Sequence, residues 1–156
     1  EDCYWSMTTS YQEVKNQGAQ VIIVSFHWGT EKSNIPDDAQ KTLAHLAIDQ
    51  GADLVVGHHP HVLQGIEKYQ GKNIVYSLGN FCFGGNKNPS DKDTMIFQQT
   101  FTVENGKLEE DDVTNIIPCS LSSESGYNNY QPMVLEGSEK ERVLQKIEDF
   151  STAINQ

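Results

Sequence analysis

The sequence lacks the features of a membrane or secreted precursor protein. It has no run approaching the roughly 18 apolar residues of a spanning helix, and residues 1–5 carry neither the basic nor the apolar part of a signal peptide. The 156 residues are 37% hydrophobic, which suffices for one core. We therefore expect a single soluble domain over residues 1–156, without an anchor of its own.

Basic residues are few. The sequence has 11 Lys and Arg against 22 Asp and Glu, and its formal net charge is −11. Such a surface repels nucleic acid and anionic lipid. We expect no nucleic-acid partner, and an acidic polymer would need bound cations or a local groove in order to bind.

Cysteines are also scarce. Cys3, Cys82 and Cys119 are odd in number and widely spaced, which excludes both a disulfide framework and a Cys-x-x-Cys zinc site. Cys82 lies in an apolar run, so we interpret it as a small core residue.

The first half of the chain alternates helical and strand patterns. The end of a helix is indicated over residues 10–17, and 19–26 form a continuous β-branched run typical of a buried strand. Residues 36–51 show helical spacing from an acidic start to a glycine end, and 53–56 indicate a second buried strand. A strand-helix-strand unit normally joins parallel strands by a right-handed crossover. The sequence therefore predicts an α/β fold.

The second half is of a different kind. Asn105-Gly106 between apolar runs is a strong hairpin signal, and apolar residues recur on one side of a terminal helix over 138–154. Strands are predicted at 73–78, 95–103 and 113–117. We thus expect a mixed fold in which the parallel unit is followed by an antiparallel hairpin and a terminal helix.

Four of the five histidines follow predicted strands. His27 comes after the first strand, and His58, His59 and His61 come after the second. Parallel strands bring such residues to one carboxyl edge, where open α/β folds hold ligands, and neutral imidazole is the commonest metal ligand. His27 alone would suit an ordinary strand-end histidine, but core packing hardly explains three histidines around Pro60. The sequence predicts a metal site, with the direct ligands among the clustered histidines left open.

Other polar residues have two interpretations each. Glu31 could orient a histidine or act as a general acid or base, or be a solvated loop charge. Asn80 follows the third strand and could hold a ligand, or form an ordinary Gly-Asn turn. His45 has no clustered partner and is interpreted as a partly exposed helix residue. Asp53 begins its strand, roughly 13 Å from the histidine end, and so lies at the wrong edge for a ligand.

These motifs together resemble a known family. The sequence contains, in order, His27-Trp28-Gly29, Gly51-Ala52-Asp53, the run from Gly57 to Gln64 (GHHPHVLQ) and the run from Tyr76 to Phe81 (YSLGNF). This series resembles the CapA/PgsA family of poly-γ-glutamate capsule synthesis proteins, whose fold is similar to calcineurin-like metallophosphoesterases. The resemblance covers most of residues 10–135.

The resemblance implies an αββα sandwich with a dinuclear centre of Mn, Fe or Zn at the sheet edge. It implies that His27, His59 and His61 ligate metal. From their places in the sequence we further predict that Glu31 and His58 are catalytic, and that Asn80 and Trp28 bind substrate or support the ligands. The usual chemistry of such enzymes is attack on phosphorus by a metal-bound hydroxide. The parent protein is then expected to be a metal-dependent hydrolase of capsule synthesis; the alternative is a noncatalytic module for assembly, export or polymer binding.

The sequence departs from the family at two points. The family's first half, which resembles the carboxylate-supplying part of phosphoesterases, is not matched, and Lys32 follows Glu31 where the family often has tyrosine. We therefore expect a carboxyl-terminal portion of a longer protein held at the outer face of the cell membrane, and no efficient catalysis by this portion alone. The expected partners are the amino-terminal half or a second copy at an open sheet edge, other capsule synthesis proteins, and an acidic polymer.

Overall fold

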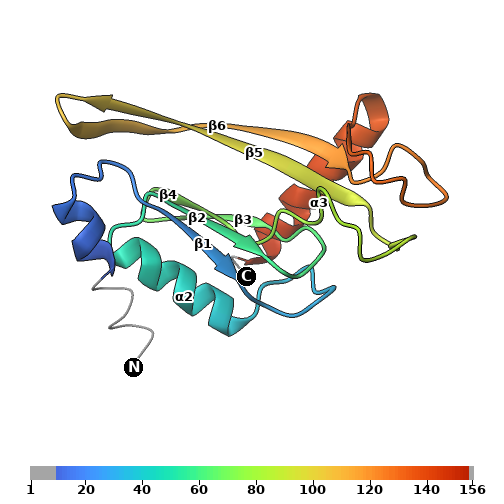
Figure 1. Ribbon diagram of the computed structural model, residues 1–156, viewed down its shortest axis with the longest axis horizontal. Helices are drawn as coiled ribbons and strands as arrows, with labels where there is room; N and C mark the ends of the chain where they lie inside the picture. The colour runs from blue at the N-terminus through green and yellow to red at the C-terminus, as the bar shows by residue number, and fades with distance from the viewer. Residues whose placement is uncertain (1–9, 155–156) are drawn as a thin grey trace.

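The computed structural model describes residues 10–154 and has a mixed α/β architecture (Figure 1). Residues 10–16 are helical, and Cys3 lies outside the described residues. The elements that follow are β1 (Ile23–His27), α2 (Asp38–Asp49), β2 (Leu54–His58), β3 (Ile66–Tyr69), β4 (Lys72–Val75), β5 (Asp93–Glu104), β6 (Lys107–Ser120), β7 (Met133–Val134) and α3 (Gly137–Ile154). The predicted parallel unit, hairpin and terminal helix are all confirmed.

The parallel unit begins the first sheet. β1 and β2 pair in parallel across the α2 crossover, and β4 pairs in parallel with β2. α2 begins where it does because Asp37 caps it: the Asp37 carboxylate accepts from Gln40 N at 2.9 Å, and the Gln40 side chain accepts from Asp37 N at 3.1 Å. The sheet order is β1-β2-β4-β3.

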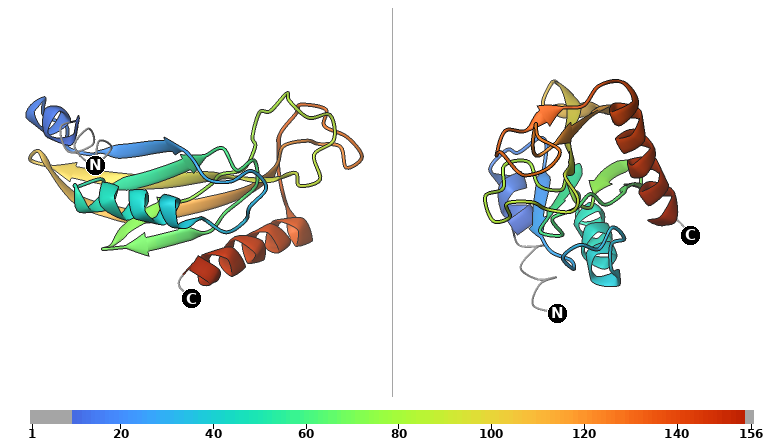
Figure 2. Two further views of the ribbon diagram at one scale, coloured as in Figure 1. Left: turned by 90° about the horizontal axis from the view of Figure 1, so that it is seen from below. Right: turned by 90° about the vertical axis from the view of Figure 1, so that its right-hand side faces the viewer.

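Side chains alternate between two cores on either face of this sheet. On β2, Val55 joins the cluster beneath α2, whereas Leu54 and Val56 face the second sheet and α3. Figure 2 shows the resulting layers, with α2 on one side of the first sheet and the long β5-β6 hairpin on the other. α3 packs alongside against β3 and β6. This arrangement is consistent with part of the αββα sandwich implied by the resemblance.

The second sheet is built on the predicted turn. Asn105 and Gly106 adopt φ values of 50° and 78°, the left-handed pair that a two-residue type I′ hairpin requires. The register runs from Glu104–Lys107 to Asp93–Ser120, so both strands are longer than predicted. β7 adds a third strand by pairing with β6.

Three expectations from the sequence are wrong. β1 is not buried, since among residues 10–154 it is an edge strand with β2 as its single partner, and Ile23 is 55% exposed. Cys82 is exposed, because it lies in the loop after β4 and not in a strand. The third strand ends at Val75, and β3, which forms a hairpin with it, was not predicted. No helix within residues 10–154 combines the length and the apolar character needed to cross a membrane.

Candidate metal centre

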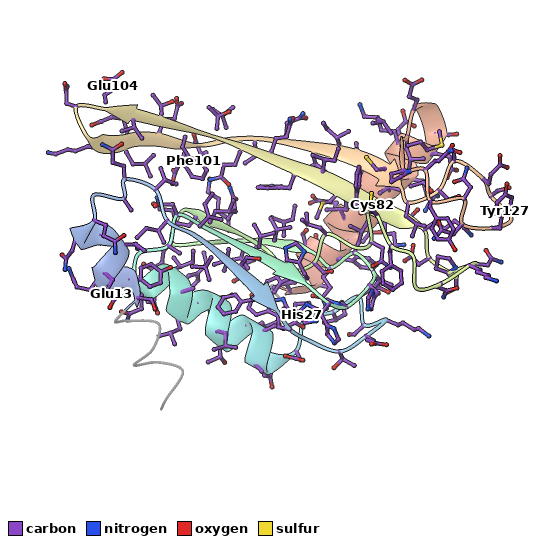
Figure 3. The ribbon with its side chains drawn as sticks, in the orientation of Figure 1. Glu13, His27, Cys82, Phe101, Glu104 and Tyr127 are labelled. Atoms are coloured by element: carbon purple, nitrogen blue, oxygen red, sulfur yellow. The ribbon has the colours of Figure 1, made fainter. Side chains whose placement is uncertain are left out.

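The histidines meet at the carboxyl edge of the parallel strands. His27 ends β1, His58 ends β2, and the two are register partners. The ring of His27 lies against that of His59, with centroids 4.6 Å apart, and the rings of His59 and His61 are 5.9 Å apart. Figure 3 labels His27 at this end of the sheet. Two separate loops thus bring imidazoles side by side, as the strand pattern predicts.

The backbone between the clustered histidines is strained. His59 has φ 102° and His61 has φ 61°, both in the left-handed region that residues with a side chain rarely adopt. The segment is therefore not locally extended. Each such residue costs about 1–3 kcal/mol and persists where its surroundings enforce it. Here Pro60 is buried, and its carbonyl accepts from Lys32 N at 2.7 Å. The surrounding contacts therefore hold the turn in an unfavourable conformation, and this conformation sets the directions of the His59 and His61 side chains.

Three potential ligands converge at this turn. One ligand atom from each of Glu31, His59 and His61 lies within 4.8 Å of the others. Glu31 is exposed and the two histidines are partly buried. Two imidazoles and one carboxylate form a donor set that suits zinc and related divalent ions and leaves a coordination position open. The donor set therefore fits a metal ion, with Glu31 as one of the three potential ligands and the tilted ring of His27 next to His59.

Asn80 orients the ring of His61. The amide Nδ2 of Asn80 donates to the His61 carbonyl at 3.2 Å, so its Oδ1 faces the His61 ring, 2.8 Å from Nδ1. An amide oxygen only accepts, so a neutral His61 ring in this arrangement carries its proton on Nδ1 and leaves Nε2 available to coordinate. A ligand histidine commonly has this kind of support. The structure thus places Asn80 where a supporting residue of the site belongs.

Trp28 is buried, whereas the His58 side chain is exposed. Trp28 is 8% exposed, and its indole Nε1 donates to the Tyr76 carbonyl at 2.9 Å. A Cβ on Gly57 would come within 2.3 Å of that Nε1 and 2.0 Å of the Tyr76 oxygen, so only glycine permits this approach. Trp28 therefore packs beneath the strand ends and not toward a ligand. The His58 side chain is exposed, outside the group of three donors.

Two other polar residues were considered at sequence level. Asp53 lies at the opposite edge, where it accepts from Ile22 N at 2.9 Å and pairs with Lys72 at 3.0 Å, which confirms its exclusion. His45 does have a partner: its Nε2 is 2.9 Å from a Glu67 oxygen. The interpretation of His45 as a partly exposed helix residue outside the cluster is confirmed. Its partner Glu67 belongs to β3, the strand that was not predicted.

A pocket of about 300 Å³ opens beside the donor group. Glu31, Lys32, His61 and Asn80 line one side, and the loop from Phe83 to Asp91 forms the other. The Phe83 ring lies 4.8 Å from that of His61. The sequence pattern did not single out this wall because residues 84–93 read as a polar loop.

Asn128 anchors the wall from behind. It is 3% exposed, and its amide Nδ2 donates to the carbonyls of Phe83 at 2.9 Å and Asn86 at 3.1 Å. Its backbone N–H also donates to Lys87 O at 2.7 Å. A segment some forty residues further along the chain therefore fixes the shape of the pocket.

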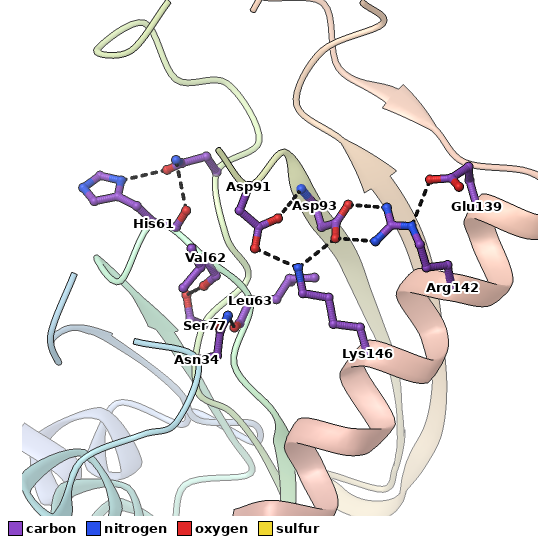
Figure 4. A network of polar contacts seen from close by, with 11 residues as sticks. Asn34, His61, Val62, Leu63, Ser77, Asp91, Asp93, Glu139, Arg142 and Lys146 are labelled. Carbon is purple, nitrogen blue, oxygen red and sulfur yellow. Dashed lines mark hydrogen bonds and ion pairs between the residues drawn. The ribbon is translucent and has the colours of Figure 1, made fainter. Parts of the chain in front are cut away.

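An ion-pair network ties the end of the wall to α3 (Figure 4). Arg142 donates to both Asp93 oxygens at 2.9 and 2.7 Å, and Lys146 pairs with Asp91 at 2.7 Å and with Asp93 at 2.8 Å. Burial alone would raise the pKa of Asp93, but the hydrogen bonds from Arg142 and Lys146 outweigh it and lower that pKa. Burial would lower the pKa of Lys146, and its two carboxylate partners raise it instead.

The fold and the site define a mixed α/β domain with a histidine-carboxylate cluster at the carboxyl edge of its parallel strands. Residues 6–85, just over half of the chain, match the family described as bacterial capsule synthesis protein PGA_cap. The chain belongs to this family, as the sequence motifs predict.

Curated relatives match shorter segments. The PGA biosynthesis protein CapA of Bacillus subtilis is 55% identical over 65 residues, which are 42% of this chain and 17% of the relative. The capsule biosynthesis protein CapA of Bacillus anthracis is 47% identical over 72 residues, 46% of this chain and 18% of the relative. A probable polyglutamine synthesis accessory protein of Mycobacterium tuberculosis is 40% identical over 60 residues, 38% of this chain and 16% of the relative. The matched segments thus span less than a fifth of each relative.

Proposed function

We propose that this chain acts in bacterial capsule biosynthesis and supplies the histidine part of a divalent metal site for hydrolase-type chemistry. Family membership and the names of the relatives support the first part. The second is carried by one observation: Glu31, His59 and His61 converge on a backbone turn that is strained at both histidines. A place at the cell surface, outside the cytoplasm, follows from the proposed role in the capsule.

The ligands have distinct tasks in this proposal. Glu31 and His59 bind the ion directly, and His61 binds through Nε2 because Asn80 holds the proton on Nδ1. His27, whose ring lies beside that of His59, belongs to a second ion whose remaining ligands come from elsewhere in the full protein. When bound, a divalent ion of Mn, Fe or Zn would act as a Lewis acid toward a substrate oxygen. His58 and Glu31 are the residues proposed to move protons near it.

Metal binding tests this proposal without requiring turnover. Isothermal titration of the chain with Zn²⁺ and Mn²⁺ should show one tight site. His59→Ala, His61→Ala and Glu31→Gln should each weaken binding at least about tenfold, since each removes one of three ligands. His45→Ala, at a histidine that pairs with Glu67 away from the site, is the matched control and should bind like the wild type. Wild-type protein that binds no ion, or that binds equally after His59→Ala, would refute the metal site.

The second candidate function is a noncatalytic module that binds other proteins of the capsule machinery or the polymer itself. The open edge of β1 favours it, because in the part of the chain that the structure describes this strand pairs only with β2 and leaves Ile23 exposed. A second copy or another segment of the full protein would add a strand there. The Ile23→Lys variant should abolish concentration-dependent association measured by sedimentation, and a wild-type chain that stays monomeric would contradict self-pairing. Metal-dependent turnover of a phosphodiester by the full protein, lost in His27→Ala, would contradict a binding-only role.

A further inference from the structure

Lys32 is the single cation among the described residues that line the pocket beside the donor group. Within residues 10–154 its ammonium takes part in no ion pair, although the chain carries twice as many acidic as basic residues. An unpaired lysine in an acidic protein is common on open surface. Here it faces a pocket, next to a proposed metal ligand.

The backbone fixes the position of Lys32. Its N–H donates to the Pro60 carbonyl at 2.7 Å, and its φ of 62° lies in the left-handed region. Lys32 is therefore attached to the same strained turn that aims His59 and His61. The Cβ of Lys32 is therefore held at a fixed position relative to the three donor residues.

Asp91, the third charged residue in the described lining of the pocket, already has a partner. Asp91 pairs with Lys146 at 2.7 Å, which leaves Glu31 and Lys32 as the uncompensated pair of opposite charges. A divalent ion on Glu31 and two neutral histidines would therefore give the pocket a net positive charge. A bound cation is often the largest local charge in a site, so it sets the sign of the ligand that the site attracts.

The size and lining of the pocket suit a small ligand. About 300 Å³ is at the lower end of small-molecule sites. Phe83 supplies an apolar wall, while Asn86 and Ser90 supply neutral hydrogen-bonding groups. A small acid with a short apolar chain fits this combination.

We propose that the pocket binds an oxyanion, a carboxylate or phosphate group, which is held between the metal ion and the ammonium of Lys32. This inference rests on the proposed metal site and adds its ligand class. Lys32 is the specificity residue: it selects an anionic group over a neutral one. The metal and the anion bind cooperatively, because each compensates charge that the other brings into the pocket.

Titration with two probes tests this. The Mn²⁺-loaded chain is titrated with inorganic phosphate and, separately, with glutarate, which shows whether phosphate, carboxylate or both are accepted. Lys32→Gln should weaken binding of the accepted anion at least about tenfold. Lys32→Arg should stay within about threefold of the wild type, and Lys140→Gln, an exposed lysine on α3, should have no effect. Without anion, Lys32→Arg and Lys140→Gln should bind Mn²⁺ like the wild type, and Lys32→Gln should bind it at least as tightly, because it removes a positive charge beside the proposed ligand Glu31.

The outcomes separate the two proposals. Wild-type protein that binds no Mn²⁺ would overturn the metal site and this inference with it. Protein that binds Mn²⁺ but neither anion, or that binds an anion equally well with and without Mn²⁺, would overturn the inference alone. The same holds if Lys32→Gln binds the anion as tightly as the wild type.

Discussion

The substitution Asn80→Ala removes the hydrogen-bond support of His61 and leaves every proposed ligand residue in the sequence unchanged. Asn80 accepts from His61 Nδ1 at 2.8 Å and donates to the His61 carbonyl at 3.2 Å, so its loss frees the ring to rotate and to change its tautomer. Loss of such a supporting residue typically lowers metal affinity 10- to 100-fold. That range corresponds to about 1.4–2.7 kcal/mol. The expected cost in folding stability is smaller, about 1 kcal/mol, because Asn80 is only partly buried.

Competition with a chromogenic chelator measures this effect directly. Asn80→Asp is the informative companion, because a carboxylate still accepts from Nδ1 while the donor to the His61 carbonyl is lost. We expect Asn80→Asp to bind metal within about tenfold of the wild type and Asn80→Ala to fall further. Asn115→Ala, which removes an exposed amide that bonds Gln98 on the second sheet, is the control. Equal metal affinity of Asn80→Ala and the wild type would refute the argument that Asn80 orients a ligand.

Three further substitutions test the supports of the site. Gly57→Ala places a Cβ 2.0 Å from the Tyr76 oxygen and should cost about 3 kcal/mol, seen as a lower Tm and a smaller urea midpoint. Asp93→Asn should lower the free energy of unfolding by about 2 kcal/mol at pH 7. The pKa of Asp93 is lowered in the folded protein, so the stability that Asp93 contributes is present above the unfolded pKa of about 3.9 and is lost as pH falls through the folded pKa. The stability of the variant should therefore change less in acid than that of the wild type. Asn128→Asp replaces two donated hydrogen bonds by repulsion from two carbonyls and should cost about 2–3 kcal/mol, with faster amide exchange in the pocket wall; exchange unchanged from the wild type would contradict its anchoring role.

Much of the fold follows from local patterns in the sequence. The β-branched run before His27, the acidic start of α2 and the Asn105-Gly106 turn each encode their element within a few residues, and the structure contains all three. The histidines come together because a parallel pair places both strand ends at one edge, which is a rule of topology and needs no detailed packing.

What the sequence did not predict depends on contacts between distant residues. β3 is four residues long and carries Glu67 and Lys68, so it has no apolar run that marks a strand. The burial of β1 was misjudged because an apolar run does not reveal how many strands will flank it. The residue types around Pro60 do not indicate a left-handed backbone at His59 and His61. Accordingly, the donor group that includes Glu31 became visible only in three dimensions.

The site divides between the part of the chain that matches the family and the part that follows it. The proposed donors and Asn80 lie within residues 6–85, whereas most of the pocket wall and its anchors Asn128 and Lys146 lie beyond residue 85. The donors therefore belong to the family-matched segment, and the shape of the pocket depends on the segment that follows it. Anchors on a separate loop and on α3 hold most of the wall, whereas Lys32 is bonded to the strained turn that aims the histidines and Phe83 lies against His61. The pocket therefore combines two parts of the chain: the family-matched segment contributes the proposed donors and Lys32, and the segment that follows contributes most of the opposite wall.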